Sequence, residues 1–361
     1  MFILMRYIKR WQSIFMQSKM STSHIYEAKK VVLFLLPPKS IKSGGILSIF
    51  GLAKASRTLL NDAQVVFATF PGKDTYAKVD WFDNDENIYR FSQIVNDKIS
   101  AKDIIIHIPE YLAGKFVGRL SRRQKEILKS IPALQINILN QNIDLMPSRE
   151  MLEGLFELTP TVTQTTAHDR YATQEICDKW KMPLHHLSTK LGTPACAPLE
   201  FNKKKEDKII ALSPDKNPYR ERIIDVIKKD LPDYRMITVK DMTYEEYFSL
   251  LAKSMFVITF GEGFDGYFIQ PFSKRSIGLS VYNDTFFPSK DWLLLDNVYS
   301  SYEEMSENIV DDIRRMENDE AIYSNVISKN REEILKVYSH KKTDNNLARF
   351  YKGEYDFYPS K

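Results

Sequence analysis

The 361-residue sequence has only two cysteines and no long apolar run. Cys177 and Cys196 stand far apart, and neither belongs to a Cys-x-x-Cys pair or to a cysteine–histidine cluster with metal-ligand spacing. This pattern excludes a disulfide-stapled scaffold and favours a reducing cytoplasm. No run of about eighteen apolar residues occurs and no small-residue cleavage site follows an apolar core near the start, so we expect neither a transmembrane helix nor export.

Concentrated charge of one sign is also missing. Lysine and arginine total 51 against 47 aspartate and glutamate, which gives a formal net charge of +4. This mild excess argues against a nucleic-acid partner and suits phosphorylated or anionic-lipid partners. An apolar content of 43% is ordinary for a folded soluble protein. The length suits two domains of about 150 residues each.

Basic and apolar residues share the first segment, residues 1–20, which contains no acid. As a helix it would place apolar side chains in the headgroup boundary of an anionic membrane surface. We therefore expect a basic amphipathic extension over residues 1–27 and a protein that is peripheral on the inner face of the cytoplasmic membrane. An arm packed on the protein, or a leader upstream of a start at Met20, are the alternatives. The basic residues are Arg6, Lys9, Arg10 and Lys19.

Short apolar runs alternate with stretches of helical spacing along the chain, which predicts largely parallel sheets covered by helices. Residues 198–207, with proline, asparagine and a lysine run, separate two such series and indicate a linker. We expect two Rossmann-like domains facing across a cleft, over 28–200 and 201–335, and a C-terminal tail over 336–361 that packs back toward the first. The expected strands are 31–36, 64–69, 103–108, 134–139 and 161–165, then 209–212, 234–239, 256–260 and 276–281.

In the first domain, candidate residues follow the expected strands, where ligands of such folds bind. Ser43, Gly44 and Gly45 lie between a strand and a helix, so their backbone amides can approach a phosphate or a sugar hydroxyl. An ordinary glycine turn is the alternative. His107 ends the third strand and can hydrogen-bond a sugar hydroxyl, although a lone histidine is also often a structural residue.

In the second domain, the first strand leads into a loop with two cations. Lys216 and Arg220 stand at the expected start of a helix. Departure of a nucleoside diphosphate builds negative charge on its phosphates, and cations at this point stabilise that charge without a metal. A solvated basic loop is the alternative.

Glu262 directly follows the expected strand 256–260, and Gln270 follows it eight positions later. A carboxylate there accepts hydrogen bonds from sugar hydroxyls, and a glycine turn before a helix exposes backbone amides to an anion. Gln270 lies two helical turns on and presents its amide on nearly the same face. In the alternative, Glu262 caps the helix and Gln270 packs beside it. The expected donor-binding residues are Lys216, Arg220, Gly263, Phe264, Asp265, Gly266 and Gln270.

These residues resemble the retaining family 4 type of GT-B glycosyltransferases, which carries a glutamate, seven residues and a second glutamate. The resemblance implies that Glu262 contacts the transferred sugar, Gln270 the ribose, His107 the sugar and Lys216 the diphosphate. Gln270 replaces the second glutamate of the family. Asp265 stands where the family usually has glycine, and its arginine–lysine pair is only partly matched.

The resemblance implies a retaining, metal-independent hexosyltransferase without a cofactor. We expect it to move a sugar from a nucleotide sugar to a glycan or lipid-linked acceptor in bacterial surface polysaccharide synthesis, such as lipopolysaccharide or capsule. Glu262 and His107 are its expected catalytic residues. The alternatives are a nucleotide-sugar epimerase of similar fold and an inactive sugar-binding subunit, for which the missing second glutamate is the motivating observation.

Overall fold

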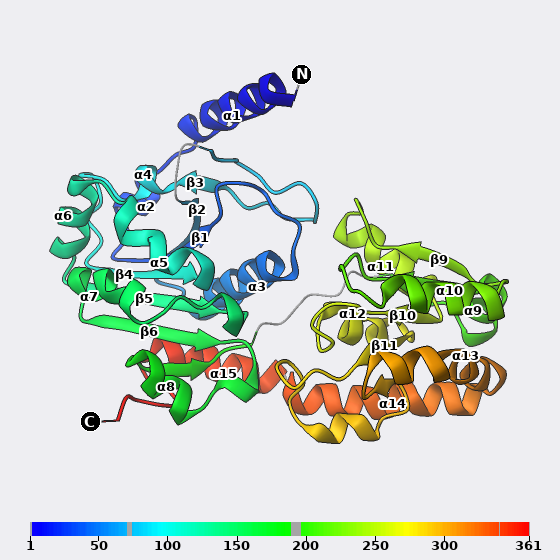
Figure 1. Ribbon diagram of the computed structural model, residues 1–361. Coiled ribbons are helices and arrows are strands. Elements are labelled where there is room, and N and C mark those ends of the chain that lie inside the picture. The colour runs from blue at the N-terminus through cyan, green and yellow to red at the C-terminus, as the bar shows by residue number, and fades with distance from the viewer. Residues whose placement is uncertain (1, 71–73, 189–195, 339, 361) are drawn as a thin grey trace. The chain divides into compact units, whose positions relative to one another are not determined.

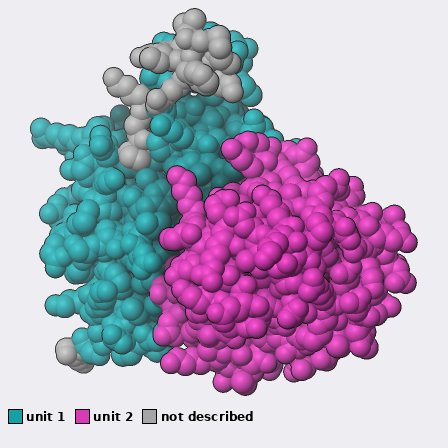
Figure 2. Space-filling view, turned by 45° about the vertical axis from the view of Figure 1, so that its right-hand side comes forward, with its two compact units in different colours: residues 1–80, 84–191, 340–361 teal, residues 81–83, 192–339 magenta. Residues whose placement is uncertain are grey.

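The structure is a computed structural model that describes residues 2–70, 74–188, 196–338 and 340–360. The chain divides into two compact α/β units (Figure 2). Unit 1 comprises Met1–Asp80, Asn84–Leu191 and His340–Lys361, and unit 2 comprises Trp81–Asp83 and Gly192–Ser339.

In the described part of unit 1, parallel strands form one sheet in the order β3-β2-β1-β4-β5-β6-β7 (Figure 1). The central strands are continuous apolar runs because helices bury both faces of the sheet. Within β1 every residue from Val31 to Leu36 is buried. The strands are β1 (Lys30–Leu36), β2 (Ala63–Thr69), β3 (Ile88–Arg90), β4 (Asp103–Pro109), β5 (Ala133–Asn140), β6 (Thr161–Thr166) and β7 (Leu184–His186).

Helices α3 and α6 of unit 1 begin at serines that cap them. Ser43 Oγ accepts a hydrogen bond from the amide of Ile46 at the start of α3, and Ser121 forms a capping box with Gln124 at the start of α6. The helices are α1 (Phe2–Ser18), α2 (Ser23–Tyr26), α3 (Gly44–Leu59), α4 (Phe91–Ile94), α5 (Glu110–Arg119), α6 (Arg122–Ser130), α7 (Glu153–Leu158), α8 (Gln174–Trp180) and α15 (His340–Tyr351), with 3-10 turns η1 (Ile143–Leu145), η2 (Glu150–Leu152) and η3 (Asp169–Tyr171).

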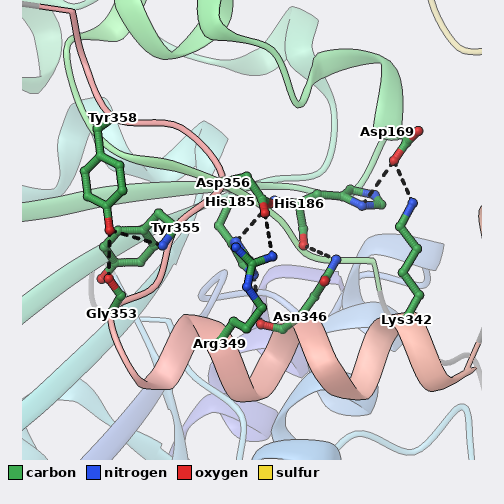
Figure 3. Close-up of polar contacts among 10 residues, drawn as sticks. All are labelled: Asp169, His185, His186, Lys342, Asn346, Arg349, Gly353, Tyr355, Asp356 and Tyr358. Carbon is green, nitrogen blue, oxygen red and sulfur yellow. Dashed lines mark hydrogen bonds and ion pairs between the residues drawn. The ribbon is translucent and has the colours of Figure 1, made fainter.

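The last helix, α15, is held in unit 1 by a polar network at β7 (Figure 3). Asp356 accepts a hydrogen bond from the amide of His186 at 2.8 Å, and its carboxylate lies 2.9 Å from Nδ1 of His185 and 2.7 Å from Arg349. Burial alone would raise the pKa of Asp356, but the hydrogen bonds from His185 and His186 and the Arg349 cation outweigh it and lower that pKa. Asn346 donates to the carbonyl of His186 at 3.0 Å. The network fixes a segment that is distant in sequence onto the edge strand.

In the described part of unit 2, a second parallel sheet has the order β12-β11-β10-β8-β9. Phenylalanines fill much of its core, among them Phe256, Phe264 and Phe268. The strands are β8 (Ile209–Leu212), β9 (Arg235–Thr238), β10 (Phe256–Ile258), β11 (Ile277–Val281) and β12 (Val298–Tyr299); the helices are α9 (Phe201–Asp207), α10 (Arg220–Asp230), α11 (Tyr244–Lys253), α12 (Gly266–Ile269), α13 (Tyr302–Asn318) and α14 (Glu320–Val337), with 3-10 turns η4 (Gln270–Lys274) and η5 (Lys290–Leu294).

The alternating α/β pattern predicted from sequence is confirmed in both units. One segment differs: residues 201–207, expected to belong to a linker, form helix α9 of unit 2. Lys204 is fully buried, and its Nζ donates to the carbonyls of Ser254 at 2.9 Å and Lys274 at 2.8 Å and to Ser276 Oγ at 2.7 Å. Burial lowers the pKa of Lys204 to about 7. The lysine run therefore contributes to packing, which its composition alone did not indicate.

Two further elements differ in extent. Strand β10 ends at Ile258, two residues earlier than predicted, because Thr259 and Phe260 turn into the loop that precedes α12. Helix α12 spans only Gly266–Ile269 and passes into the 3-10 turn η4, where Pro271 has no amide hydrogen for a further helical bond. Among the described residues, no helix has both the length and the apolarity that crossing a membrane requires.

Candidate functional site

The site that sequence and fold indicate lies at the carboxyl edge of the unit 2 sheet. Strand β8 is paired with β9 on one side and β10 on the other, so the chain reverses its direction of travel across the sheet at β8. In an open parallel sheet the crevice beside such a reversal is where ligands bind. Two of the loops at this edge are residues 213–219, after β8, and 259–265, after β10.

Hydrogen bonds join these two loops directly. Ser213 Oγ accepts from the amide of Phe260 at 2.9 Å, and Asn217 Nδ2 donates to the carbonyl of Phe260 at 3.3 Å. Asn217 Oδ1 also accepts from the amide of Tyr219 at 2.9 Å, which shapes the turn into α10. The loops therefore present a fixed backbone at the sheet edge.

The two predicted cations occupy different positions. Arg220 donates to the carbonyls of Ser213 and Asp215 and, at 3.1 Å, to Thr238 Oγ1, and its guanidinium lies 4.8 Å from the ring centre of Phe260. Its donors thus stabilise the loop after β8. Lys216 is exposed within the same loop. Of the two, Lys216 is the cation that is accessible to a phosphate.

Gly263 makes the bend that follows β10. Its φ is +85°, a conformation that side chains with a Cβ rarely adopt. A Cβ there would also lie 2.6 Å from the carbonyl oxygen of Val281, and Ser280 Oγ donates to the carbonyl of Gly263 at 2.8 Å. Glu262, immediately before the bend, is partly buried at the sheet edge.

Beyond the bend, Phe264 enters the core and Asp265 begins the next helix. The ring of Phe264 is buried and lies 4.8 Å from that of Trp292, so only its backbone remains for a ligand. Asp265 Oδ1 accepts from the amide of Phe268 at 3.1 Å, and Oδ2 accepts from Thr259 Oγ1 at 2.7 Å. Burial, followed by the charge of Asp215, raises the pKa of Asp265 to about 6. The helix-capping role that the sequence left open for Glu262 is filled by Asp265.

Gln270 lies at the junction of α12 and η4. Its Nε2 donates to the hydroxyl of Tyr244 at 3.3 Å, and a Cβ on Gly266 would lie 3.3 Å from its Oε1. The amide is thus oriented by protein contacts, and it stays partly exposed. Its predicted contact with a ribose stays a prediction.

Sequence reasoning did not select Asp215, which the fold brings to the same edge. A Cβ built on Gly261 would lie 2.9 Å from Oδ2 of Asp215 and 3.2 Å from Oδ2 of Asp265. Burial is the main cause of the raised pKa of Tyr267 and of Tyr302, and both carboxylates lie close enough to raise each pKa further. An acid that follows the first strand of a Rossmann-like unit is the signal that could have identified Asp215.

The glycine loop of unit 1 begins helix α3. Gln141 Nε2 donates to the carbonyl of Gly45 at 3.1 Å, and a Cβ on Gly45 would lie 2.7 Å from Gln141 Oε1. A Cβ on Gly44 would meet no described atom within 4 Å. The close approach at Gly45 is therefore made by Gln141, and the hydroxyl of Ser43 caps the helix. A phosphate contact at this loop stays a prediction.

His107 does not present its ring at an exposed strand end. It is fully buried in β4, stacked on Phe34 with ring centres 4.4 Å apart, and its Nδ1 and Nε2 lie 3.1 Å from Asn137 Nδ2 and 3.3 Å from the Tyr351 hydroxyl. Burial lowers its pKa to about 3, which keeps the ring neutral. The structural alternative for His107 is the one that these contacts support, because α15, through Phe350 and Tyr351, covers it.

Two consecutive parallel α/β units of this kind make up the GT-B fold of glycosyltransferases, and this chain has that fold. No family model matches the chain, and no curated protein matches its sequence. Sucrose-phosphate synthase from Thermosynechococcus elongatus has a similar structure, with a TM-score of 0.58 and 9% identity over 90% of this chain and 98% of that one.

Two other solved structures are similar over nearly their whole length. An α-glucosyltransferase in complex with UDP and a 13-mer DNA gives a TM-score of 0.56 at 9% identity, over 90% of this chain and 99% of that one. A glycosyltransferase from Rickettsia africae gives a TM-score of 0.53 at 10% identity, over 90% of this chain and 98% of that one. At such low identity the likeness concerns the fold, and the function has to be argued from the residues of the site.

Proposed function

We propose that this protein is a glycosyltransferase that moves a sugar from a nucleotide sugar to a glycan or lipid-linked acceptor. The observation that carries the proposal is the carboxyl edge of the unit 2 sheet, where Glu262 and the Gly263 bend lie beside the loop of Lys216. The fold shared with glycosyltransferases, one of them bound to UDP, supports it. The donor nucleotide sugar binds at this edge.

Each residue of the edge has a role in the proposed reaction. Glu262 accepts hydrogen bonds from hydroxyls of the transferred sugar, and the backbone amides after Gly263 face the diphosphate. Lys216 stabilises the charge that develops on the leaving phosphates. Arg220 holds the loop that carries Lys216, and Gln270 contacts the ribose. By resemblance to the family 4 type, the transfer retains the anomeric configuration.

The first experiment is a thermal-shift screen across nucleotide sugars and nucleoside diphosphates. A ligand that binds only the folded state at 100 times its Kd stabilises it by about 2.7 kcal/mol. Transfer from the selected donor is then measured for wild type, Glu262→Ala and the control Glu221→Ala, an exposed acid on α10. We expect E262A to abolish transfer without lowering Tm, and E221A to retain it. Full activity of E262A would overturn the proposal.

The acceptor side of the proposal involves helix α1. Its side chains Trp11 and Phe15 are 65% and 60% exposed, while Gln17 is buried and donates to Thr75 Oγ1 at 2.8 Å and to the carbonyl of Ile88 at 2.9 Å. The end of α1 is thus fixed to unit 1 while large apolar side chains face outward. We propose that α1 contacts an anionic membrane surface, where a lipid-linked acceptor of bacterial surface polysaccharide synthesis is available.

Vesicle sedimentation tests the proposed contact of α1 with an anionic membrane surface. We expect binding to vesicles that contain phosphatidylglycerol, weaker binding to phosphatidylcholine alone, and loss of binding in the double variant Trp11→Ser, Phe15→Ser. The matched control is Leu294→Ser, which removes an apolar side chain that is 81% exposed in unit 2. Equal binding of the double variant and the wild type would exclude α1 as the membrane contact.

An inactive sugar-binding subunit is the second candidate function. The observation that favours it is Gln270, whose amide replaces the expected carboxylate and contacts Tyr244. This candidate predicts nucleotide-sugar binding in the thermal-shift screen without turnover of any donor. Restoring the carboxylate with Gln270→Glu would then leave turnover at zero.

A further inference from the structure

Two carboxylates converge beside Gly261 at the carboxyl edge of unit 2. The Oδ2 atoms of Asp215 and Asp265 would lie 2.9 Å and 3.2 Å from a Cβ built on that glycine. Among the described residues, no lysine, arginine or histidine forms an ion pair with either acid. The nearest guanidinium, that of Arg220, donates to backbone carbonyls and to Thr238 instead. The pair therefore has no ion-pair partner among the described residues, and Arg220 bonds the backbone carbonyl of Asp215 rather than its carboxylate.

Both carboxylates retain the capacity to bind a further group. Among the described residues, none donates a hydrogen bond to the carboxylate of Asp215, whose backbone carbonyl accepts from Arg220. Asp265 accepts hydrogen bonds from Thr259 and Phe268, which leaves lone pairs on a group that offers about four acceptor sites.

Three tyrosines lie close enough to the acidic pair to be influenced by its charge, namely Tyr247, Tyr267 and Tyr302. Tyr247 is 6% exposed, and its buried hydroxyl has no hydrogen-bond partner among the described residues. Burial is the main cause of the raised pKa of Tyr247, and Tyr267 and Asp265 lie close enough to raise it further. A buried polar group without a partner costs free energy, so such groups in a folded protein usually indicate a ligand, an ion or a water. The hydroxyl is thus an independent sign that the acidic neighbourhood holds something more.

The charge of the proposed donor determines what that additional group is. A nucleoside diphosphate is anionic, and two carboxylates at its binding edge repel it. Lys216 and Arg220 together carry two positive charges, which do not balance both acids and the diphosphate. Mg²⁺ in proteins is commonly held by one or two carboxylates together with phosphate oxygens of the substrate, and it keeps several waters. Such waters also suit the neighbouring tyrosine hydroxyls.

We infer that Asp215 and Asp265 hold a divalent cation that bridges them to the diphosphate of the donor. The inference rests on the proposed function, because the diphosphate supplies the remaining ligands. Within the described residues no three histidine, cysteine, aspartate or glutamate side chains gather in a metal site, so the cation binds together with the nucleotide. This departs from the metal-independent reaction implied by the family resemblance, and Asp265, which stands where that family usually has glycine, is the residue that makes the difference.

Isothermal titration calorimetry tests the inference with UDP, GDP, ADP, CDP and TDP. Each nucleotide is titrated once in about 5 mM MgCl₂, a concentration that saturates a site of ordinary Mg²⁺ affinity, and once in EDTA. We expect Mg²⁺ to tighten binding of the preferred nucleotide about tenfold or more in the wild type. In Asp215→Asn we expect the affinities measured in MgCl₂ and in EDTA to differ by less than about twofold. The control Asp225→Asn, an exposed acid on α10, retains it. Mg²⁺ chelated by free nucleotide acts equally on all variants, so the comparison isolates the protein site.

The outcomes separate this inference from the proposed function. Equal affinity in MgCl₂ and EDTA would overturn the cation site and leave the nucleotide site in place. A Mg²⁺ effect that persists unchanged in D215N would also overturn it. No binding of any of these nucleotides in either buffer would contradict both. Asp265→Asn serves as the second variant; since asparagine also caps helices, we expect it to stay folded and to lose the Mg²⁺ effect.

Discussion

Single residues decide the shape of the unit 2 edge, and Gly263 is the clearest example. We predict that Gly263→Ala lowers the free energy of unfolding by about 2 kcal/mol or more, because a positive φ costs alanine about 1–2 kcal/mol and its Cβ meets the carbonyl of Val281. Gly44→Ala is the matched control, since its Cβ meets no described atom within 4 Å. We expect it to stabilise α3 by up to about 1 kcal/mol. Urea unfolding compares the two, and similar losses would contradict the assigned role of Gly263.

His107 gives a prediction about pH. Burial lowers its pKa from 6.5 to about 3, so between these values the unfolded chain binds a proton that the folded chain does not. Its contribution to stability is therefore complete above about pH 6.5 and falls as the pH drops toward 3, by up to about 1.4 kcal/mol per pH unit. The variant His107→Asn loses packing contacts at every pH, but its free energy of unfolding lacks this dependence on the titration of a histidine. We expect the stability gap between wild type and H107N to narrow from pH 7 to pH 4, and a constant gap would contradict a neutral buried imidazole.

At the scale of elements, the sequence predicted β1 and β4 well because each consists mainly of apolar residues that are buried on both faces of the sheet. The short strands β3, β7 and β12 carry too few residues for such a signal. The burial of His107 was not predictable locally, since Tyr351, which covers it, lies 244 positions away. Likewise, Lys204 is buried only because carbonyls from other elements meet its ammonium group.

The attachment of α15 gives a prediction at this scale. The carboxylate of Asp356 contacts the ring of His185, the amide of His186 and the guanidinium of Arg349. Asp356→Ala removes these contacts, and a hydrogen bond to a charged group contributes about 1.5–3 kcal/mol to stability. We expect faster amide hydrogen exchange throughout α15 and a lower Tm. Lys352→Ala, exposed just after α15, is the control and should leave both unchanged. Unchanged exchange in D356A would mean that apolar packing alone holds the helix.

At the scale of the whole molecule, the sequence predicted two Rossmann-like units, and their shared fold with glycosyltransferases confirms that prediction. The Glu262 segment was recognisable because a strand, a glycine bend and a helix start follow one another in sequence. The pairing of Asp215 with Asp265 was not, because the two acids belong to loops that follow different strands and meet only in the folded sheet.

Membrane contact gives the prediction for the whole molecule. The basic residues of segment 1–20 add an electrostatic term to the apolar contact of α1, and salt screens that term over about 8 Å at 0.15 M ionic strength. We expect binding to anionic vesicles to weaken several-fold between 0.05 and 0.5 M NaCl, values that span roughly 14 to 4 Å of screening. Vesicle sedimentation at each NaCl concentration measures the fraction of protein that is bound. Binding that is independent of salt would assign the contact to apolar side chains alone.

Hydrogen–deuterium exchange upon addition of the nucleotide selected by thermal shift tests the central claim most directly. The claim is that the donor binds the loops after β8 and β10. The account predicts slower exchange in residues 213–220 and 259–270 at saturating nucleotide, with the effect on 259–270 reduced in Glu262→Ala. Protection that is absent from both loops, or confined to unit 1, would contradict it.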